Sequence, residues 1–332
     1  MSTPPNPSSE TKPFGADALK LDCAAETARI TELLQHGVHS ELHRQGAVVG
    51  ISGGIDSSTV LALCVKAFGP EHVLGILMPE RHSSPDSAVL AHAVASHYGV
   101  STVTEDISDA LEGLGCYRRQ AEAIRRVFPE YGDGWKAKIV LPGSLLDKPT
   151  LNIFSLSVTS PDGRTSTQRL PTQEYSQIVA ASNFKQRTRM AILYYHAELR
   201  NYAVIGTANK DERDQGFFVK HGDGGIDVDP IVHLFKMQVY QLAEYLGVPP
   251  QVRQRTPTSD TYSGGSTQEE FFFRLPFEIL DMVWLGHEQG VPNASIAEAL
   301  ALSTQQVERI VADIVRKQRT THYLRSAPLR LD

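Results

Sequence analysis

The sequence predicts an α/β protein: a doubly wound parallel sheet with helices on both faces, followed by a helical C-terminal extension. Two observations carry this prediction. Short apolar runs alternate with helical patterns over the first third of the chain, and a glycine-rich loop directly follows the first of these runs. Parallel strands need a crossover helix between them, and phosphate sites lie at the carboxyl ends of such strands. At 332 residues the chain is long enough to bury a large core.

Each element follows from a local pattern. Short runs rich in β-branched and other apolar residues indicate strands, whereas apolar residues that recur every three or four positions indicate helices. Helix 236–246 ends before Gly247, a residue type favoured just after a helix. The expected elements are, in chain order, helix 19–43, strand 46–51, helix 57–68, strand 73–78, helix 87–99, strand 101–104, helix 183–199, strand 202–206 and helix 236–246.

Changes in composition divide the chain. Residues 1–18 are rich in Pro, Ser and Thr, which is typical of a disordered lead-in and not of a signal peptide. The α/β domain is expected over residues 19–265. An insertion at about 115–177 interrupts it with turn signals and a strand-like run at 152–159. We expect this insertion to form a hairpin over the active site.

The C-terminal segment, residues 266–332, has a helical pattern with a break at 290–292. Two short helices around a turn at Ser303 have the layout of a helix-turn-helix. A DNA-binding role needs basic residues at the start of the second helix, where Gln305 and Gln306 stand instead. We therefore favour a helical hairpin that packs on the main domain.

Charge and cysteine content narrow the functional class. The net charge of −6 argues against a nucleic-acid binder. The three cysteines stand far apart without a CxxC pair, which indicates a reducing compartment and no disulfide or zinc framework. No apolar run approaches the roughly 20 residues of a membrane span. We therefore expect a cytoplasmic protein without nucleic-acid or membrane partners.

The most informative segment is the loop after the first strand, which reads Gly-Ile-Ser-Gly-Gly-Ile-Asp-Ser-Ser. Backbone N–H groups of such a loop, at a helix N-terminus, bind a phosphate chain. It lacks the Gly-Lys-Ser/Thr end of a Walker A motif, and its acid, Asp56, requires a divalent cation such as Mg²⁺ to face polyphosphate. We infer chemistry that cuts ATP between the α- and β-phosphates. The candidate ATP-binding residues are Gly50, Ser52, Gly53, Gly54, Asp56, Ser57 and Ser58.

This loop resembles the Ser-Gly-Gly-x-Asp-Ser signature of the ATP pyrophosphatases, and later motifs narrow the resemblance. They include a helix start with polar and basic side chains, a strand end followed by an acid, and a segment rich in glycine and aspartate. In order, the motifs are 183–190, 204–207, Glu212, 216–227, Pro230, Lys236 and 257–258. Together with the loop, they resemble an ammonia-dependent NAD synthetase. The resemblance covers roughly residues 45–110 and 180–275 and implies an adenine nucleotide alpha hydrolase-like fold.

The resemblance implies a two-step reaction. ATP adenylates the nicotinate carboxylate of deamido-NAD and releases pyrophosphate, and ammonia then displaces AMP to form the amide. Asp56 and Glu212 are the implied Mg²⁺ ligands. The implied ATP contacts are Thr207, Lys236 and Thr258, and the implied deamido-NAD contacts are Asn183, Arg187, Lys220 and Asp227. The family resemblance also implies a symmetric homodimer with the dinucleotide near the interface.

Four points stay open from the residues alone. Asp223 is the candidate for binding ammonium and taking its proton, and the alternative is that it caps a turn among three glycines. The family's C-terminal His-Lys pair has its nearest counterpart in His322-Tyr323. We expect nitrogen from free ammonia or from a separate glutaminase partner. A related ATP pyrophosphatase that amidates another small carboxylate is the alternative function.

Overall fold

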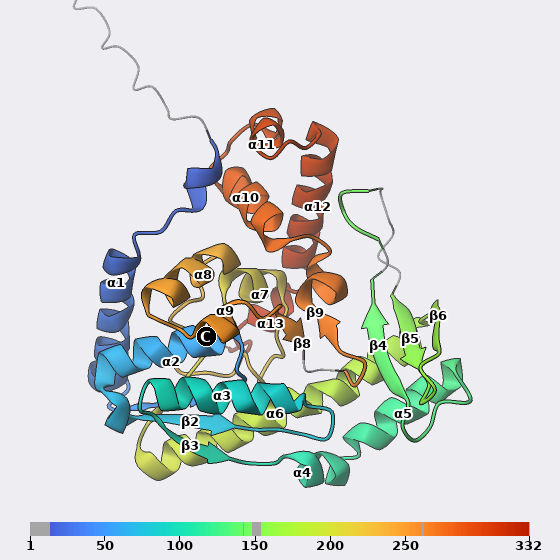
Figure 1. The fold of residues 1–332 in the computed structure, drawn as a ribbon, viewed down its shortest axis with the longest axis horizontal. Coiled ribbons are helices and arrows are strands. Elements are labelled where there is room, and N and C mark those ends of the chain that lie inside the picture. The colour runs from blue at the N-terminus through green and yellow to red at the C-terminus, as the bar shows by residue number, and fades with distance from the viewer. Residues whose placement is uncertain (1–13, 142, 148–153, 260–261, 332) are drawn as a thin grey trace, which may run out of the picture.

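The computed structural model describes residues 14–141, 143–147, 154–259 and 262–331. Its central feature is a parallel sheet of four strands in the order β3-β2-β1-β7 (Figure 1). The strands are β1 Ala47–Gly50, β2 Val73–Leu77, β3 Ser101–Thr104 and β7 Ala203–Ile205. Val48 of β1 pairs with Leu74 on one side and with Val204 on the other. The predicted doubly wound α/β fold is confirmed.

Helices cover both faces of the sheet, because side chains alternate between the two faces of each strand. Val49 faces the core formed with α1, α2, α3 and α8, whereas Val48 faces α6. Strands that are buried on both faces read as continuous apolar runs, which explains the two adjacent valines. The bounds of these helices are α1 Cys23–Gln35, α2 Ile55–Phe68, α3 Pro85–His97, α6 Thr172–Arg200 and α8 Lys236–Tyr245.

Three of these helices begin earlier than predicted, and α3 begins at Pro85, two residues before the predicted start at 87. α2 begins at Ile55, two residues before the predicted start at 57, so Asp56 lies in its first turn. α6 begins at Thr172, eleven residues before the predicted start at 183. Its first turns bury Ile178 in the core of the insertion, a tertiary contact that local periodicity does not reveal.

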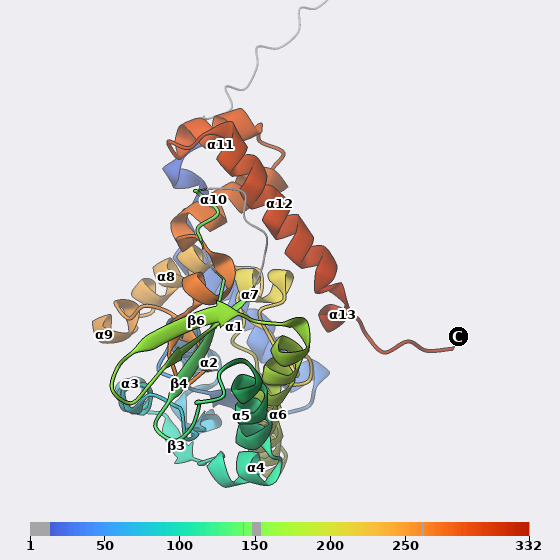
Figure 2. The ribbon, with the colours of Figure 1, turned by 90° about the vertical axis from the view of Figure 1, so that its right-hand side faces the viewer.

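The insertion is larger than the predicted hairpin. Its helix α5 (Cys116–Val127) lies along α6, and its three strands form an antiparallel sheet in the order β4-β5-β6 (Figure 2). These strands are β4 Lys136–Val140, β5 Ser155–Thr159 and β6 Thr165–Arg169. The predicted strand at 152–159 corresponds to β5, and its residues 152–153 lie outside the described part of the chain. Strands and helix enclose a core of their own.

The C-terminal segment is a set of short helices and not one nearly continuous helical run. A π-helical turn, Glu269–Phe273, precedes α10 (Phe277–Glu288), α11 (Asn293–Ala299) and α12 (Thr304–Thr320). The chain breaks at the predicted 290–292 and at the predicted turn at Ser303, and it also breaks at Pro276. Ile296, Val307 and Ile310 are buried against α10, so the pair α11–α12 packs as the predicted helical hairpin.

At the other end of the chain, residues 1–13 lie outside the described part. The remainder of the predicted lead-in contains a 3-10 turn, Ala16–Leu19, whose Leu19 is buried against the C-terminal helices. After α1, a π-helical turn, His36–Glu41, extends the first predicted helix.

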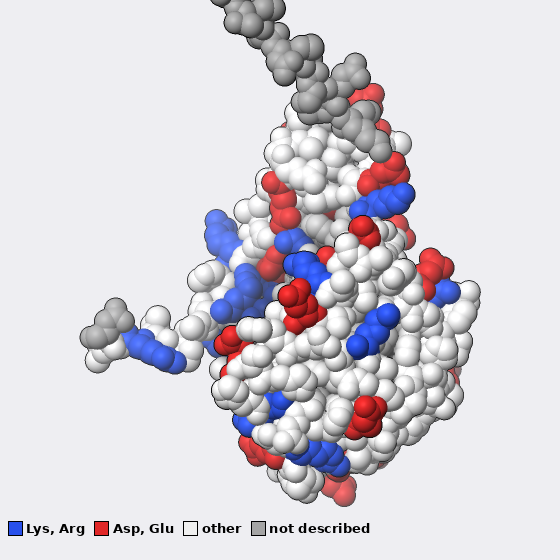
Figure 3. All heavy atoms as spheres, turned by 90° about the vertical axis from the view of Figure 1, so that its left-hand side faces the viewer, with Lys and Arg blue, Asp and Glu red and all other residues white. Residues whose placement is uncertain are grey.

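The surface of the described residues carries both signs of charge. Acidic and basic side chains are interspersed over much of the face drawn in Figure 3. No helix in the described ranges combines the length and the apolar character needed to cross a bilayer.

A buried ion pair joins the exit of β2 to the insertion and to α6. The Lys185 ammonium donates to Glu80 Oε1 at 2.8 Å, and the Tyr117 hydroxyl donates to Glu80 Oε2 at 2.8 Å. The side chains of Glu80 and Lys185 are 0% and 1% exposed. Burial alone would raise the pKa of Glu80, but Lys185 and Tyr117 lower it below its usual value. The carboxylate is therefore charged and fully paired.

We expect Glu80→Gln to destabilise the protein by about 3–5 kcal/mol, because it removes the negative charge that pairs with the buried Lys185 ammonium. Urea unfolding measures this loss. The matched control is Glu112→Gln at the exposed pair Arg81–Glu112, where we expect a change of less than about 1 kcal/mol. Equal effects of the two substitutions would contradict a structural role for the buried pair.

Candidate functional site

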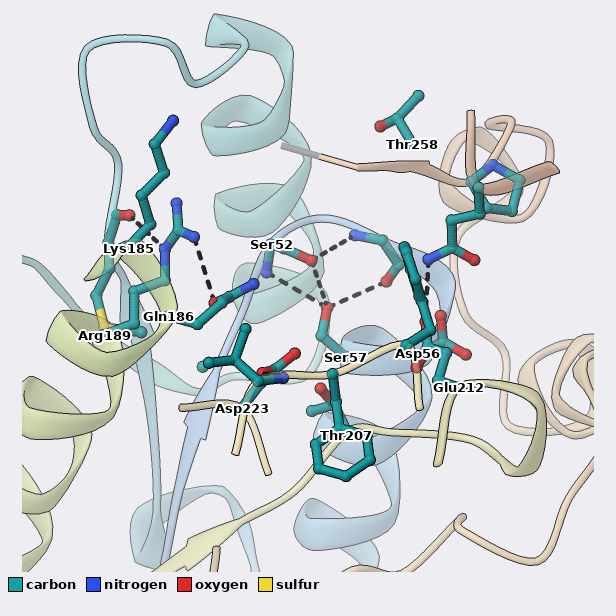
Figure 4. A pocket seen from close by; sticks show the side chains of 18 of the residues that line it. Ser52, Asp56, Ser57, Lys185, Gln186, Arg189, Thr207, Glu212, Asp223 and Thr258 are labelled. Carbon is teal, nitrogen blue, oxygen red and sulfur yellow. Dashed lines mark hydrogen bonds between the residues drawn. The ribbon is translucent and has the colours of Figure 1, made fainter. Parts of the chain in front are cut away.

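The glycine-rich loop is held by hydrogen bonds among its own serines. The Ser57 hydroxyl accepts from the Ser52 backbone N–H at 3.3 Å and donates to Gly54 O at 3.2 Å (Figure 4). The Ser58 hydroxyl also donates to Gly54 O at 2.8 Å. Gly53 has a φ of +71°, and a Cβ there would lie 2.7 Å from Ser87 O of α3. Glycine is therefore required at this position, where the loop packs against α3.

A cavity of about 580 Å³ opens at the carboxyl ends of β1, β2 and β7. Parallel α/β sheets place ligand sites at this edge. The predicted site residues that line the cavity are Gly50, Ser52, Gly54, Asp56, Ser57, Asn183, Thr207, Glu212, Asp223 and Thr258. The predicted site residues outside its lining are Gly53, Ser58, Arg187, Lys220, Asp227 and Lys236.

Asp56 is the centre of a polar cluster at the floor of the cavity. Its Oδ2 accepts from Lys236 Nζ at 2.5 Å, and its Oδ1 accepts from Asn209 Nδ2 at 2.9 Å. Lys236 is completely buried. Burial alone would lower the pKa of Lys236, but the carboxylates of Asp56 and Glu212 raise it above its usual value. Lys236 is therefore charged and fixed against Asp56.

Glu212 approaches the same cluster from α7 (Lys210–Gln215). A capping box with Asn209 fixes its backbone: Asn209 Oδ1 accepts from the Glu212 N–H at 3.1 Å. Gln268 Nε2 donates to Glu212 Oε1 at 2.9 Å. Burial, and then repulsion by the Asp56 carboxylate, raise the pKa of Glu212 to about 8. Two acids are thus held where their negative charges oppose each other.

This arrangement fits a divalent metal ion. Asp56 and Glu212 offer hard carboxylate oxygens, the ligand type that Mg²⁺ prefers, and a cation between them relieves their repulsion. Among the described residues, no group of three or more His, Cys, Asp and Glu side chains is arranged to hold a metal alone. The remaining ligands would come from substrate phosphates and water, as is usual for Mg²⁺.

Two further acids support the cluster from behind, and sequence reasoning missed both. Asp211 Oδ2 accepts from the backbone N–H of Lys236 at 2.8 Å, and Asp281 Oδ2 accepts from that of Met237 at 2.8 Å. Both acids are completely buried at the N-terminus of α8. Burial, and then the charge of Asp211, raise the pKa of Asp281 well above its usual range. Asp281 lies on α10, far along the chain from the glycine-rich loop, so no local sequence pattern indicates it.

Asp223 lies at a turn and also lines the cavity. Its Oδ1 accepts from the Val219 N–H at 2.7 Å, so the turn-capping alternative is realised. Burial raises its pKa to about 6. Because the side chain also faces the cavity, capping and a role toward a ligand are compatible at this residue.

The three remaining predicted dinucleotide contacts lie outside the cavity. Lys220 Nζ donates to the backbone oxygens of Tyr323 and Ser326, each at 2.9 Å. Arg187 Nε donates to Lys220 O at 3.3 Å. Asp227 accepts from the Tyr194 hydroxyl at 2.9 Å. Arg187 and Lys220 thereby connect α6 to the C-terminal turn α13 (His322–Arg325), whereas Asp227 connects α6 to β7.

Further residues line the cavity that were not among the predicted site residues, although Lys185, Arg189 and Phe217 lie within the predicted motifs 183–190 and 216–227. They come from the exit of β2, from the extended face of α6 and from the C-terminal region. Examples are Met78, Tyr175, Val179, Lys185, Arg189, Phe217, Tyr262, Gln268, Tyr323 and Leu324. Tyr323 belongs to the pair His322-Tyr323, so the C-terminal turn does reach the cavity.

Comparison with known proteins identifies the family of this chain. The model of the NAD synthase family matches residues 26–126 and 148–327. The chain belongs to this family. It is 51% identical over 311 residues to the NH(3)-dependent NAD(+) synthetase of Mesorhizobium japonicum, over 94% of this chain and 97% of that relative. It is 46% identical to the NH(3)-dependent NAD(+) synthetase of Rhizobium rhizogenes, over 98% of each chain.

Solved structures of NAD synthetases share the fold. The NH3-dependent NAD synthetase from Campylobacter jejuni is 21% identical, with a TM-score of 0.59 over 94% of this chain and 100% of that one. The NAD+ synthetase from Burkholderia pseudomallei is 23% identical, with a TM-score of 0.55 over 93% and 92%. At these identities the likeness supports the fold alone.

Glu212 generates a testable pH dependence in the protein without metal or nucleotide. Its pKa rises from an ordinary 4.5 to about 8 on folding, so the folded state binds the proton more tightly than the unfolded chain. Stability is therefore lost as the pH rises through this window. Because Glu212 partly faces the cavity, we expect Glu212→Gln to gain only on the order of 1 kcal/mol at about pH 9, and nothing at about pH 4.

Denaturant unfolding at both pH values measures this difference. Glu298→Gln on exposed α11 is the control, and its pH dependence should match that of the unsubstituted protein. A Glu212→Gln variant that is less stable than the unsubstituted protein at the higher pH would refute the proposed repulsion.

Proposed function

We propose that the chain is an ammonia-dependent NAD synthetase. In this proposal it uses ATP to adenylate the nicotinate carboxylate of deamido-NAD, and ammonia then replaces AMP. The observation that carries the proposal is the meeting of the glycine-rich loop, Asp56 and Glu212 at one cavity, with buried Lys236 paired to Asp56 behind its surface. The relatives named NH(3)-dependent NAD(+) synthetase, at up to 51% identity over nearly the whole chain, support it.

The first step needs the polyphosphate to be held while the α-phosphorus is attacked. The loop N–H groups at the start of α2 and the hydroxyls of Ser52 and Ser57 bind the β- and γ-phosphates, which leave as pyrophosphate. Thr207 and Thr258 line the same cavity and contact the nucleotide. Lys236 does not reach the cavity surface, so its charge acts on the phosphates through Asp56, which it orients.

Asp56 and Glu212 would hold Mg²⁺. When bound, the ion supplies charge neutralisation for the polyphosphate and for the developing pyrophosphate. The chain's own contribution is rigidity: the capping box at Asn209 and the ion pair with Lys236 keep both carboxylates in place before substrate arrives.

The second step needs ammonia, although ammonium dominates at neutral pH. Asp223 faces the cavity, and with a pKa of about 6 its carboxylate is mostly ionised at pH 7. It binds ammonium and accepts a proton as nitrogen attacks the acyl carbon and AMP departs. The ammonia comes from solution or from a separate glutaminase partner.

We assign the dinucleotide contacts to two places. Asn183 lines the cavity itself. Arg187, Lys220 and Asp227 lie beyond its lining, and in a symmetric homodimer they would serve a dinucleotide that lies along the interface. Exposed apolar side chains on α6 support such an interface, since Tyr195 and Leu199 are 57% and 64% exposed. A cytoplasmic location completes the proposal.

The decisive assay combines the protein with Mg²⁺, ATP and ammonium, with and without deamido-NAD, and follows AMP, pyrophosphate and NAD. We expect all three products only when deamido-NAD is present. AMP release that requires a different carboxylate would identify the alternative, a related ATP pyrophosphatase. AMP release without deamido-NAD and without any other added carboxylate would overturn adenylation altogether.

We expect Asp56→Asn to lower AMP formation by at least roughly 100-fold, because one metal ligand and the partner of Lys236 lose their charge. The melting temperature should show that the variant is folded. Asp109→Asn, which also changes an acid in the first turn of a helix but lies on exposed α4 (Ser108–Gly113), is the control and should keep full activity. Retained activity in Asp56→Asn would refute its metal role.

A further inference from the structure

Strand β4 lies outside the two ranges that the family model matches. The NAD synthase model matches residues up to 126 and from 148 onward, so β4 (Lys136–Val140) falls between the two matched ranges. Among the described residues it is also an edge strand, since β5 alone pairs with it inside the insertion sheet. An unpaired edge exposes backbone groups that another segment can bond. In this protein that segment belongs to the wall of the cavity.

Ala137 connects β4 to the loop that contains Ser263 and Gly264. It stands opposite Val158 of β5, and its own N–H and C=O both bond a loop on the other side. The Ala137 N–H donates to Ser263 Oγ at 3.0 Å, and the Gly264 N–H donates to Ala137 O at 3.0 Å. A Cβ at Gly264 would lie 3.0 Å from the same Ala137 oxygen. A side chain at Gly264 would therefore crowd the Ala137 carbonyl, which would have to shift by a few tenths of an ångström.

The neighbouring Tyr262 ties the same loop into the insertion core. It is 4% exposed and belongs to the cluster that Ala137, Ile139 and Ile178 form. At the same time it lines the cavity. One side chain thus belongs both to the interior of the insertion and to the wall of the candidate site.

The segment that contains Ser263 and Gly264 also carries groups that contact the cavity and the polar cluster around Asp56 and Glu212. Its two short strands, β8 Thr258–Ser259 and β9 Ser266–Thr267, pair with each other. Thr258 lines the cavity, and Gln268, directly after β9, donates to Glu212 at 2.9 Å. A shift of this segment would move Thr258 and the hydrogen-bond partner of Glu212 together.

The insertion contacts the chain beyond β9 as well. Lys138 Nζ lies 3.6 Å from Glu270 Oε2. After β4, the Leu145 N–H donates to Arg274 O at 3.4 Å, and Arg274 Nε donates to Gly143 O at 3.1 Å. In Figure 1, β4 lies beside β9 and the start of the C-terminal helices. The contacts thus run from Ser263 to Arg274.

From these contacts we infer that strand β4 is a brace that positions residues 256–259 and 262–268 of the cavity wall, with Ser263 and Gly264 as its positioning residues. The inference rests on the proposed function, because the group that the braced wall serves is ATP at the glycine-rich loop. Neither Ser263 nor Gly264 belongs to the lining of the cavity. They act through Thr258 and Gln268.

The test is the double variant Ser263→Ala/Gly264→Ala, which removes the acceptor for the Ala137 N–H and crowds the Ala137 oxygen. We expect the Kd for α,β-methylene ATP, measured in the presence of Mg²⁺, and the KM for ATP both to rise roughly tenfold. The KM for ammonia should stay unchanged. Amide hydrogens of residues 262–268 should exchange faster in the variant, while those of β1 and β2 keep their protection.

The matched control is Thr165→Ala/Gly132→Ala, which alters one hydroxyl and one glycine elsewhere in the insertion. Thr165 bonds only across to Thr159 at 3.0 Å among the contacts described, and a Cβ at Gly132 has ordinary clearance. This control should leave nucleotide affinity unchanged.

Two outcomes overturn the brace. One is unchanged nucleotide affinity in Ser263→Ala/Gly264→Ala despite faster exchange or a lower melting temperature, because β4 would then have a structural role only. The other is an equal loss of affinity in both double variants. The binding measurement needs no deamido-NAD, so it decides the brace independently of whether NAD is formed.

Discussion

The structure depends on the enforced proximity of two carboxylates, Asp56 and Glu212, with one buried ammonium, Lys236, beside them. The ammonium offsets one negative charge, and burial together with Asp56 raises the pKa of Glu212 to about 8. Three elements meet at this point: the first turns of α2 and α7 and the N-terminus of α8. A site built this way gives up stability when empty and gains it when a cation and a polyphosphate bind.

The rest of the molecule keeps these charges in place. Asp211 and Asp281 bond the first backbone N–H groups of α8 and thereby fix Lys236. Asp281 comes from the C-terminal helices, and Gln268, which bonds Glu212, comes from the wall that β4 contacts. The insertion and the C-terminal helices are therefore parts of the site's support, although most of their residues lie away from the chemistry.

The sequence was sufficient where one local pattern decides the outcome. The strands of the parallel sheet follow from continuous apolar runs, and the residues Ser52, Asp56 and Ser57 of the glycine-rich loop line the cavity, as their position after the first strand indicates. Prediction failed where distant segments decide: the first turns of α6 are helical because Ile178 enters the insertion core, and the insertion has three strands where one hairpin was predicted. Asp281 and Tyr262 reach the site only through tertiary packing, so spacing along the chain contains no trace of them.

The central claim is that this centre activates a carboxylate by transferring AMP to it. Deamido-NAD labelled with ¹⁸O in its nicotinate carboxylate tests it most directly, because the adenylate route breaks the labelled carbon–oxygen bond when ammonia attacks. Mass spectrometry of the products should find one ¹⁸O atom in each AMP formed and none in pyrophosphate. Unlabelled AMP, or label in a phosphate or pyrophosphate product, would contradict the account.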